Sequence, residues 1–349
     1  MYTTQRILKV ALALILLFFF TSGVQAQREE TPIEITKDEG TTVYRLYGTQ
    51  DYFNKHLPTQ TGSGQVFGLT FDASRDRVEE QIRKQQEETK VQPINIELVF
   101  HILYTQDERV AQEAVRSQIE ALNRDFNNKS LTSRHPNDPD GEYTSLAAST
   151  QITFTVAETE AARFGSGIST LRKTERPWES WDKMKDIRLG GSPGIEQSRY
   201  LNIWVCDLSG DIGSYSSSIY CIDEADGIVI DARYFGVSKE EDTNYSQGKT
   251  LTHLIGNYLG LQDLYNEFDY CADDYVEDTP IHNSPNNKIY PHRHRSTCPD
   301  NPVEMTMNFM DSSPDETQTM FTQGQVLRMH TVLRTTRPNL ISSNTNSKL

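Results

Sequence analysis

The pattern of apolar and polar positions predicts strands and helices in alternation from residue 93 onward. Stretches of β-branched and aromatic residues are typical of strands, and four of them occur, over residues 94–104, 151–158, 201–208 and 226–235. A long irregular region rich in Asp, Asn, Pro and His follows residue 260. This order indicates an α/β (α+β) sheet domain with a loop-rich second half.

Helical spacing of apolar residues predicts three helices between and after these strands. Residues 108–126 carry the apolar residues Val110, Ala114, Ile119 and Leu122. Residues 248–260 end on a glycine, where left-handed backbone commonly terminates a helix. Residues 321–336 open with Thr322 as the expected N-cap and place Val326, Met329 and Leu333 on one face.

The first 26 residues have the composition of a signal peptide. Arg6 and Lys9 precede the apolar run of residues 11–20, and Val24-Gln25-Ala26 fits a small-x-small cleavage site. The run is short for a membrane span, although an uncleaved anchor is the alternative. We therefore expect an exported, secreted protein with no membrane insertion after cleavage.

The rest of the chain divides into three parts. Residues 27–92 are polar and predict a propeptide-like or linker segment, in which the highly charged residues 75–90 form a solvated helix or a linker. Residues 93–340 form the main domain, and residues 341–349 are expected to be a disordered tail.

Charge and cysteine content narrow the possible partners. The chain has 34 basic and 49 acidic residues, a net charge of −15, which becomes −17 without Arg6 and Lys9. This excess of acid disfavours nucleic acid and anionic membranes as partners. Four cysteines in an exported chain suggest two disulfides. Three pairings are open, of which the local one, Cys206–Cys221 with Cys271–Cys298, is the simplest.

The stretch LTHLIGNYLGLQDLY, residues 251–265, has part of the pattern of a zinc-protease helix. In H-E-x-x-H-x-x-G-x-x-H, two histidines four residues apart share a helix face, the Glu acts as general base, and the Gly turns the chain towards a third ligand. His253, Gly256 and Gly260 stand at positions that this pattern requires. A buried helix with one structural histidine is the alternative interpretation.

Eight short motifs in order resemble the pappalysin family of metzincin zinc metalloproteases, in its cytophagalysin-like bacterial branch. They lie between residues 201 and 325 and are LNIWVCDL, GSYSS, DGIVID, GKTLTH, YLGL, DYVEDTP, MNFMD and FTQGQ. NIELVFHILY and SQIEALNRDF also resemble the family's N-terminal strand and helix, so the resemblance covers residues 94–338. The resemblance implies a metzincin-like zincin fold, in which a mixed twisted sheet and an active-site helix lie above a loop-rich C-terminal subdomain with a Met-turn. It also implies that Cys271 and Cys298 pair.

The zinc-binding motif is degenerate at the positions that carry the chemistry. The resemblance implies His253 as the first zinc ligand and Met310 as the Met-turn methionine. Leu254, however, stands at the general-base position, and Asn257 and Asp263 replace the second and third histidine ligands. Loss of a general base costs roughly 10²- to 10⁴-fold in rate, and a neutral amide is a poor zinc ligand. Zinc binding is therefore expected to be weak or absent.

Other residues enter as candidate ligands. Calcium is possible in the loop DYVEDTP, where the resemblance implies the Asp274 and Asp278 side chains and backbone oxygens of Val276 and Thr279. A solvated acidic turn is the alternative. Replacement zinc ligands or bases would have to come from elsewhere in the second half of the chain, and the candidates are His282, His292, His294, Glu267 and Asp269.

A role without catalysis remains possible for such a chain. Gly213, Ser214, Tyr215 and Ser216 correspond to the edge strand along which the family's enzymes bind peptides by strand addition. We therefore expect a secreted pseudoprotease that binds a peptide or protein. The alternatives are an active metalloendopeptidase using His253 and Asp263, and a structural or interaction protein.

Overall fold

The computed structural model describes residues 34–36, 42–44, 49, 76–130, 135–158, 167–179, 181–209, 213–219, 225–238, 244–266, 270–290 and 292–342. The predicted signal peptide and most of the predicted tail lie outside these residues, as do Cys221, Glu267 and Asp269. Within the described ranges, every helix is too short or too polar to cross a membrane.

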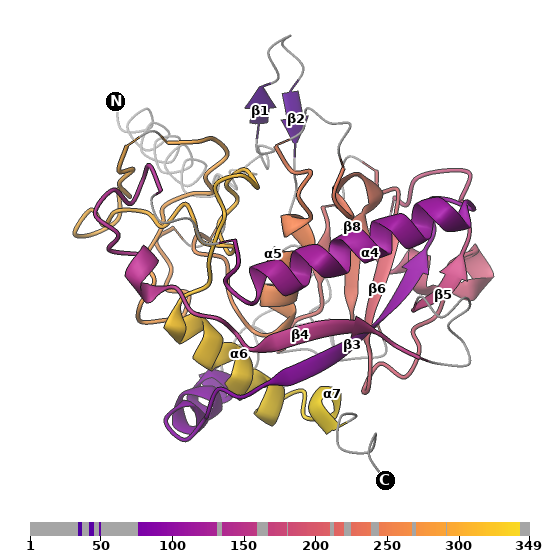
Figure 1. Ribbon diagram of the computed structural model, residues 1–349, viewed down its shortest axis with the longest axis horizontal. Coiled ribbons are helices and arrows are strands. Elements are labelled where there is room, and N and C mark those ends of the chain that lie inside the picture. Colours follow the sequence, from indigo (N-terminus) through magenta and orange to yellow (C-terminus); the bar gives the residue numbers. More distant parts are fainter. Residues whose placement is uncertain are drawn as a thin grey trace, which may run out of the picture. The chain divides into compact units, whose positions relative to one another are not determined.

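A six-stranded mixed sheet forms the centre of the domain (Figure 1). Its strands lie in the order β4 (Ile152–Val156), β3 (Ile94–Ile102), β6 (Leu201–Cys206), β8 (Ile228–Asp231) and β7 (Tyr215–Ser216), and β5 (Ile168–Leu171) also pairs with β3. All pairs are parallel except β7 with β8. The predicted mixed sheet is thus confirmed, although β5 carries no pattern that predicted it. Separately, β1 (Glu34–Thr36) and β2 (Thr42–Tyr44) form an antiparallel hairpin.

Helix α4 (Glu108–Asp125) crosses one face of the sheet next to α5 (Lys249–Tyr258) (Figure 1). Its buried residues are Ala111, Val115, Gln118, Ala121, Leu122 and Asp125. The predicted apolar face was therefore wrong in part, because Val110 is 39% exposed. The helix is rotated so that Ala111 and Val115, one turn apart, face the core in its place.

The C-terminal helices are α6 (Gln323–Thr335) and α7 (Asn339–Ser342). Thr322 is the N-cap of α6, as predicted, and forms a capping box with Gln325. The described residues also contain short 3₁₀ helices: η1 (Thr144–Leu146), η2 (Lys183–Lys185), η3 (Ile187–Leu189) and η4 (Ala232–Tyr234).

Residues 76–86 are helical, as the sequence suggested, but the helix is not a solvated one. Ile82 is 1% exposed and packs in a small apolar cluster with Ile219 and Val332. The prediction was wrong because Val78 and Ile82, one turn apart, suffice to make a narrow apolar stripe on an otherwise charged helix.

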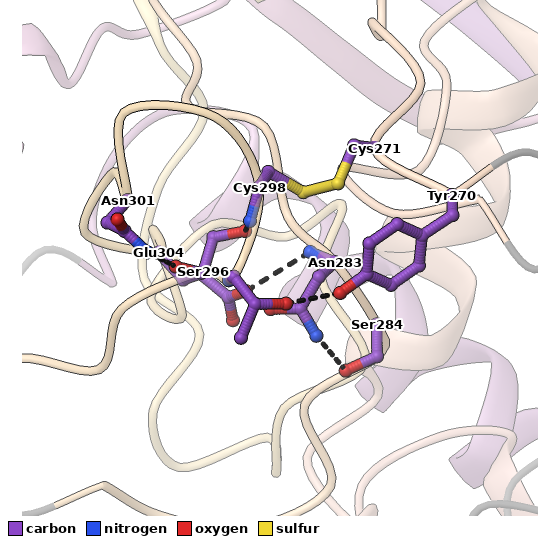
Figure 2. The surroundings of a disulfide bond; sticks show 9 residues. Tyr270, Cys271, Asn283, Ser284, Ser296, Cys298, Asn301 and Glu304 are labelled. Carbon is purple, nitrogen blue, oxygen red and sulfur yellow. Dashed lines mark hydrogen bonds between the residues drawn. A yellow bond between two sulfur atoms is a disulfide. The ribbon is translucent and has the colours of Figure 1, made fainter.

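The three described cysteines confirm one predicted disulfide and contradict the other. Cys271 and Cys298 are bonded, and Figure 2 shows their surroundings. Cys206 instead carries a free thiol. The thiol is fully buried at the end of β6, in an apolar cluster that includes Trp178 and Leu208. Burial raises the pKa of this thiol well above its usual value.

Candidate functional site

Helix α5 carries the candidate site, and two glycines shape it. Gly256 faces Met310, whose Sδ atom lies 2.4 Å from the place a Cβ would occupy, so a larger residue there would displace the methionine. Gly260 follows the helix with a φ of 89°. Its N–H donates to Asn257 O, and the N–H of Leu261 donates to Gly256 O, both at 2.9 Å. This is a Schellman motif, and it confirms the predicted helix end.

The reversal at Gly260 brings the three predicted ligand positions together. The Nε2 atom of His253 lies 3.0 Å from Oδ1 of Asp263. The amide nitrogen of Asn257 donates to the same oxygen at 2.8 Å. On the other side of the ring, Nδ1 of His253 donates to the carbonyl of Phe309 at 2.9 Å. The three predicted ligand positions therefore meet at one carboxylate oxygen of Asp263.

The hydrogen bonds of Asn257 define the orientation of its amide. The nitrogen faces two acceptors, the Asp263 carboxylate and the Leu261 carbonyl at 3.3 Å. The oxygen accepts a hydrogen bond from the hydroxyl of Thr49 at 3.3 Å. A metal ligand would direct an oxygen lone pair towards Asp263 and His253. Asn257 directs N–H groups that way instead.

Leu254, at the predicted position of the general base, is part of the main hydrophobic core. The side chain is fully buried in the same cluster as Leu251, Ile255 and Met310. Burial of a leucine contributes about 1.5–3 kcal/mol to folding, and its side chain cannot accept a proton. The position serves the stability of the fold.

These residues do not fit a catalytic zinc ion. Such a site uses three protein ligands and a bound water, whereas only His253 and Asp263 here carry suitable donor atoms. Among the residues that the structure describes, no group of three or more His, Cys, Asp or Glu side chains is placed to hold a metal ion.

Met310 lies beneath the site helix and connects it to the second half of the chain. Its carbonyl accepts a hydrogen bond from the N–H of Leu264 at 3.1 Å. Its own N–H donates to Asn308 Oδ1 at 2.9 Å. The segment around Met310 therefore supports both α5 and the return of the chain towards Asp263.

The predicted substrate-strand residues lie at and beside β7, the edge of the sheet. Gly213 and Ser214 precede the strand, and the Ser214 hydroxyl accepts a hydrogen bond from Asp231 N at 3.0 Å. The Tyr215 hydroxyl donates to Asp182 at 3.0 Å. These side chains bond within the domain, so the strand can offer a partner only its backbone.

Thr49 is a site residue that sequence reasoning missed. The N–H of Ser216 donates to the Thr49 hydroxyl at 3.2 Å, and the same hydroxyl donates to Asn257. It therefore joins the edge strand to Asn257, one of the predicted ligand positions. A single threonine in a polar segment, 167 and 208 residues from its partners, leaves no local signal that could have identified it.

The acidic loop divides its predicted calcium ligands between two places. The Thr279 hydroxyl lies 2.8 Å from both carboxylate oxygens of Asp274 and 2.7 Å from the carbonyl of Val276. Burial raises the pKa of Asp274 to about 7. Asp278 faces the start of α6, where it accepts hydrogen bonds from the Thr322 hydroxyl and the Gly324 N–H.

Of the other candidate histidines, His282 and His294 have partners of their own. His282 is buried and accepts a hydrogen bond at Nε2 from Met305 N. Its Nδ1 faces Asp311 at 3.4 Å. His294 lies 3.5 Å from Glu304, and His292 is exposed. None of these contacts involves His253.

Comparison with known proteins places this geometry in a family. Residues 195–334 match the family model Peptidase_M43, described as pregnancy-associated plasma protein-A. An extracellular metalloprotease from Arthroderma otae is 39% identical over 95 residues, which are 26% of this chain and 33% of the relative. The chain thus spans about a third of the length of this relative.

Solved structures match over most of the chain. Mature mirolysin from Tannerella forsythia, in complex with a cleaved peptide, is 30% identical with a TM-score of 0.62, over 72% of this chain and 97% of mirolysin. A promirolysin mutant from the same organism is 28% identical with a TM-score of 0.70, over 85% of this chain and 97% of promirolysin. The fold is that of a metzincin. Together with the family model, these matches show that the chain belongs to the pappalysin family of metalloproteases.

Proposed function

We propose that this chain is an exported pappalysin-family protein that does not hydrolyse peptides efficiently and acts by binding a peptide or protein. The observation that carries the proposal is a hydrogen bond between two of the predicted ligand positions. The amide N–H of Asn257 donates to the carboxylate of Asp263 that a metal ion would need. Leu254, packed in the core, removes the base as well. A weak metal site and a missing base each lower the rate of peptide hydrolysis, so together they lower it further.

The edge strand supports the binding role. Ser216 donates its backbone N–H away from β8, to a hydroxyl of another segment. A peptide that adds to a sheet edge uses backbone hydrogen bonds of this kind and requires no metal. Because Tyr215 and Ser216 are buried in this structure, such a peptide would have to displace Thr49. Mature mirolysin, which resembles this chain, was solved with a cleaved peptide. A retained peptide-binding edge in this chain is consistent with that likeness.

Two measurements on the purified chain test the loss of catalysis. Elemental analysis should find much less than one zinc per chain, and casein should remain intact during prolonged incubation. Stoichiometric zinc together with chelator-sensitive digestion of casein would show an active metalloendopeptidase and overturn the proposal.

A reversion series tests the cause of the loss. The triple substitution Leu254→Glu, Asn257→His and Asp263→His should restore stoichiometric zinc if only the ligands were lost. The pair Asn257→His and Asp263→His, which leaves Leu254 in place, should bind zinc but cut casein roughly 10²- to 10⁴-fold more slowly than the triple variant. No zinc in either variant would show that more than the ligand set has changed.

We propose calcium as the ion of the acidic loop. The Thr279 hydroxyl and the N–H groups of Val276 and Thr279 are donors facing three oxygens of Asp274 and Val276. Because each of these oxygens has two lone pairs, the cluster has more acceptor sites than donors. Hard oxygen ligands suit calcium. Added calcium should raise the Tm, and Asp274→Asn should abolish that rise. An equal rise in both proteins would contradict this assignment.

Export is part of the same proposal. Residues 1–26 serve as a cleaved signal peptide, a view supported by relatives named extracellular metalloproteases. Mass spectrometry of the protein recovered from the medium should give an N-terminus at Gln27. Met310, packed against Gly256, would act as the Met-turn methionine beneath the site.

A further inference from the structure

The helix of residues 76–86 contacts two elements that border the site. Figure 1 shows this helix, in indigo, beside α6. Ile82 packs against Val332 of α6 and against Ile219, which follows the edge strand β7 by three residues. Ile219 also reaches the site helix, because its Cδ1 lies 3.1 Å from the place a Cβ on Gly260 would occupy.

A buried arginine joins the same helix to the end of α5. Arg328, on α6, is 1% exposed. Its guanidinium donates to both carboxylate oxygens of Glu79, at 2.8 and 2.7 Å. Its Nε donates to the carbonyl of Gly260 at 2.7 Å. A bidentate, charge-assisted pair of this kind is among the stronger side-chain contacts, and here it also holds the carbonyl at the reversal of the site helix.

The residues that follow the helix of residues 76–86 also contact α6. The Thr331 hydroxyl donates to that of Thr89 at 3.1 Å, and Arg334 donates to the carbonyl of Lys90 at 2.9 Å. Residues 79 to 90 are therefore attached to α6 along about two of its turns, from Arg328 to Arg334. A linker would not carry an apolar contact, a buried ion pair and two further hydrogen bonds to a single helix.

We infer that residues 76–92 are a permanent clamp of the folded domain, which stays bound to α6 even when the chain is cut next to it. The clamp holds the end of α5 through Arg328 and the segment after β7 through Ile82. Its loss would expose Ile219 and Val332 and leave Arg328 without its carboxylate. The function of the clamp is independent of whether the site binds peptide or cuts it.

The clamp can be tested on the full chain with a specific protease sequence inserted between Gln92 and Pro93, which are both exposed. After cleavage, size-exclusion chromatography should find the N-terminal fragment eluting with residues 93–349. Glu79→Gln keeps the shape of the side chain and removes the charge, and it should weaken retention of the fragment by at least about tenfold. Separation of the wild-type fragment at micromolar concentration would overturn the inference.

Glu80→Gln provides the matched control on the adjacent residue. Glu80 is solvent-exposed and pairs with Lys84 on the same helix, so the change should leave fragment retention unaltered. In the uncut chain, Glu79→Gln should lower the Tm and speed amide exchange at Gly260 and Leu261, and Glu80→Gln should do neither. Equal effects of the two substitutions in the uncut chain would refute the clamp even if the inserted sequence prevents folding.

Discussion

His101, on β3, offers a sharp test of the buried polar chemistry in this fold. It is fully buried and stacks on Trp204. Nε2 donates to Asn202 Oδ1 at 2.9 Å, and Nδ1 accepts from the hydroxyl of Ser192 at 2.8 Å. The oxygen and nitrogen of the Asn202 amide cannot exchange places. The oxygen also accepts a hydrogen bond from the N–H of Ile195, and the nitrogen donates to the Ile195 carbonyl. The neutral ring is therefore held in the tautomer that carries its proton on Nε2.

Burial lowers the pKa of His101 from 6.5 to about 4, and neighbouring Lys185 acts in the same direction. Below pH 6.5 the unfolded chain takes up this proton while the folded chain does not. The stabilisation is thus complete above pH 6.5 and is lost as the pH falls towards 4. Linkage gives a loss of about 2 kcal/mol in unfolding free energy between pH 7 and pH 5.

The assay is urea denaturation of wild type and His101→Gln at both pH values. Glutamine can form hydrogen bonds at this position but does not titrate, so the variant should lose about 2 kcal/mol less than wild type on acidification. Because the result is a difference of differences, other titrating groups cancel. His292→Gln, at an exposed histidine, controls for the substitution itself. Equal losses in wild type and His101→Gln would refute the reasoning.

Three further predictions concern buried groups elsewhere. Asp226→Ala should cost about 3–5 kcal/mol in urea denaturation, because it leaves Arg337 buried without its bidentate partner; a loss below 1 kcal/mol would contradict this. Replacing Cys271 and Cys298 by serine should cost about 3–4 kcal/mol, since the bond closes a loop with a sequence separation of 27; unchanged stability on reduction would argue against it. In a thiol titration, Cys206→Ala should lower the number of reactive thiols by one in denaturant and leave the number in the native protein unchanged. Reaction of Cys206 in the native protein would contradict its burial.

Local sequence patterns were sufficient for β3, β4, β6, β8 and the three main helices, although not for β5, and they indicated that the ligand positions meet. The glycine at position 260 implied a left-handed turn, and that turn brings Asp263 back to His253. Thr322 and Gln325 likewise have the spacing of a capping box, which the structure forms. Each of these features depends on residues close together in the chain.

Contacts between distant segments could not be predicted in this way. Thr49 meets Asn257, and Glu79 meets Arg328, across more than two hundred residues. Neither pair shares a periodicity or a motif that would connect its members. The free thiol of Cys206 was missed for a related reason, because pairing by nearness in sequence ignores that its side chain points into the apolar side of β6.

The Thr49 bridge has a consequence for any ligand of the edge strand. The hydroxyl that joins Ser216 to Asn257 belongs to the same chain, so it competes with an added peptide for the backbone N–H of Ser216. Its effective concentration is on the order of millimolar, as in other linked systems. Binding measured on the intact chain is thus an exchange of one partner for another. A peptide should bind more tightly to Thr49→Val, which keeps the shape of the side chain but gives up both hydrogen bonds, than to wild type.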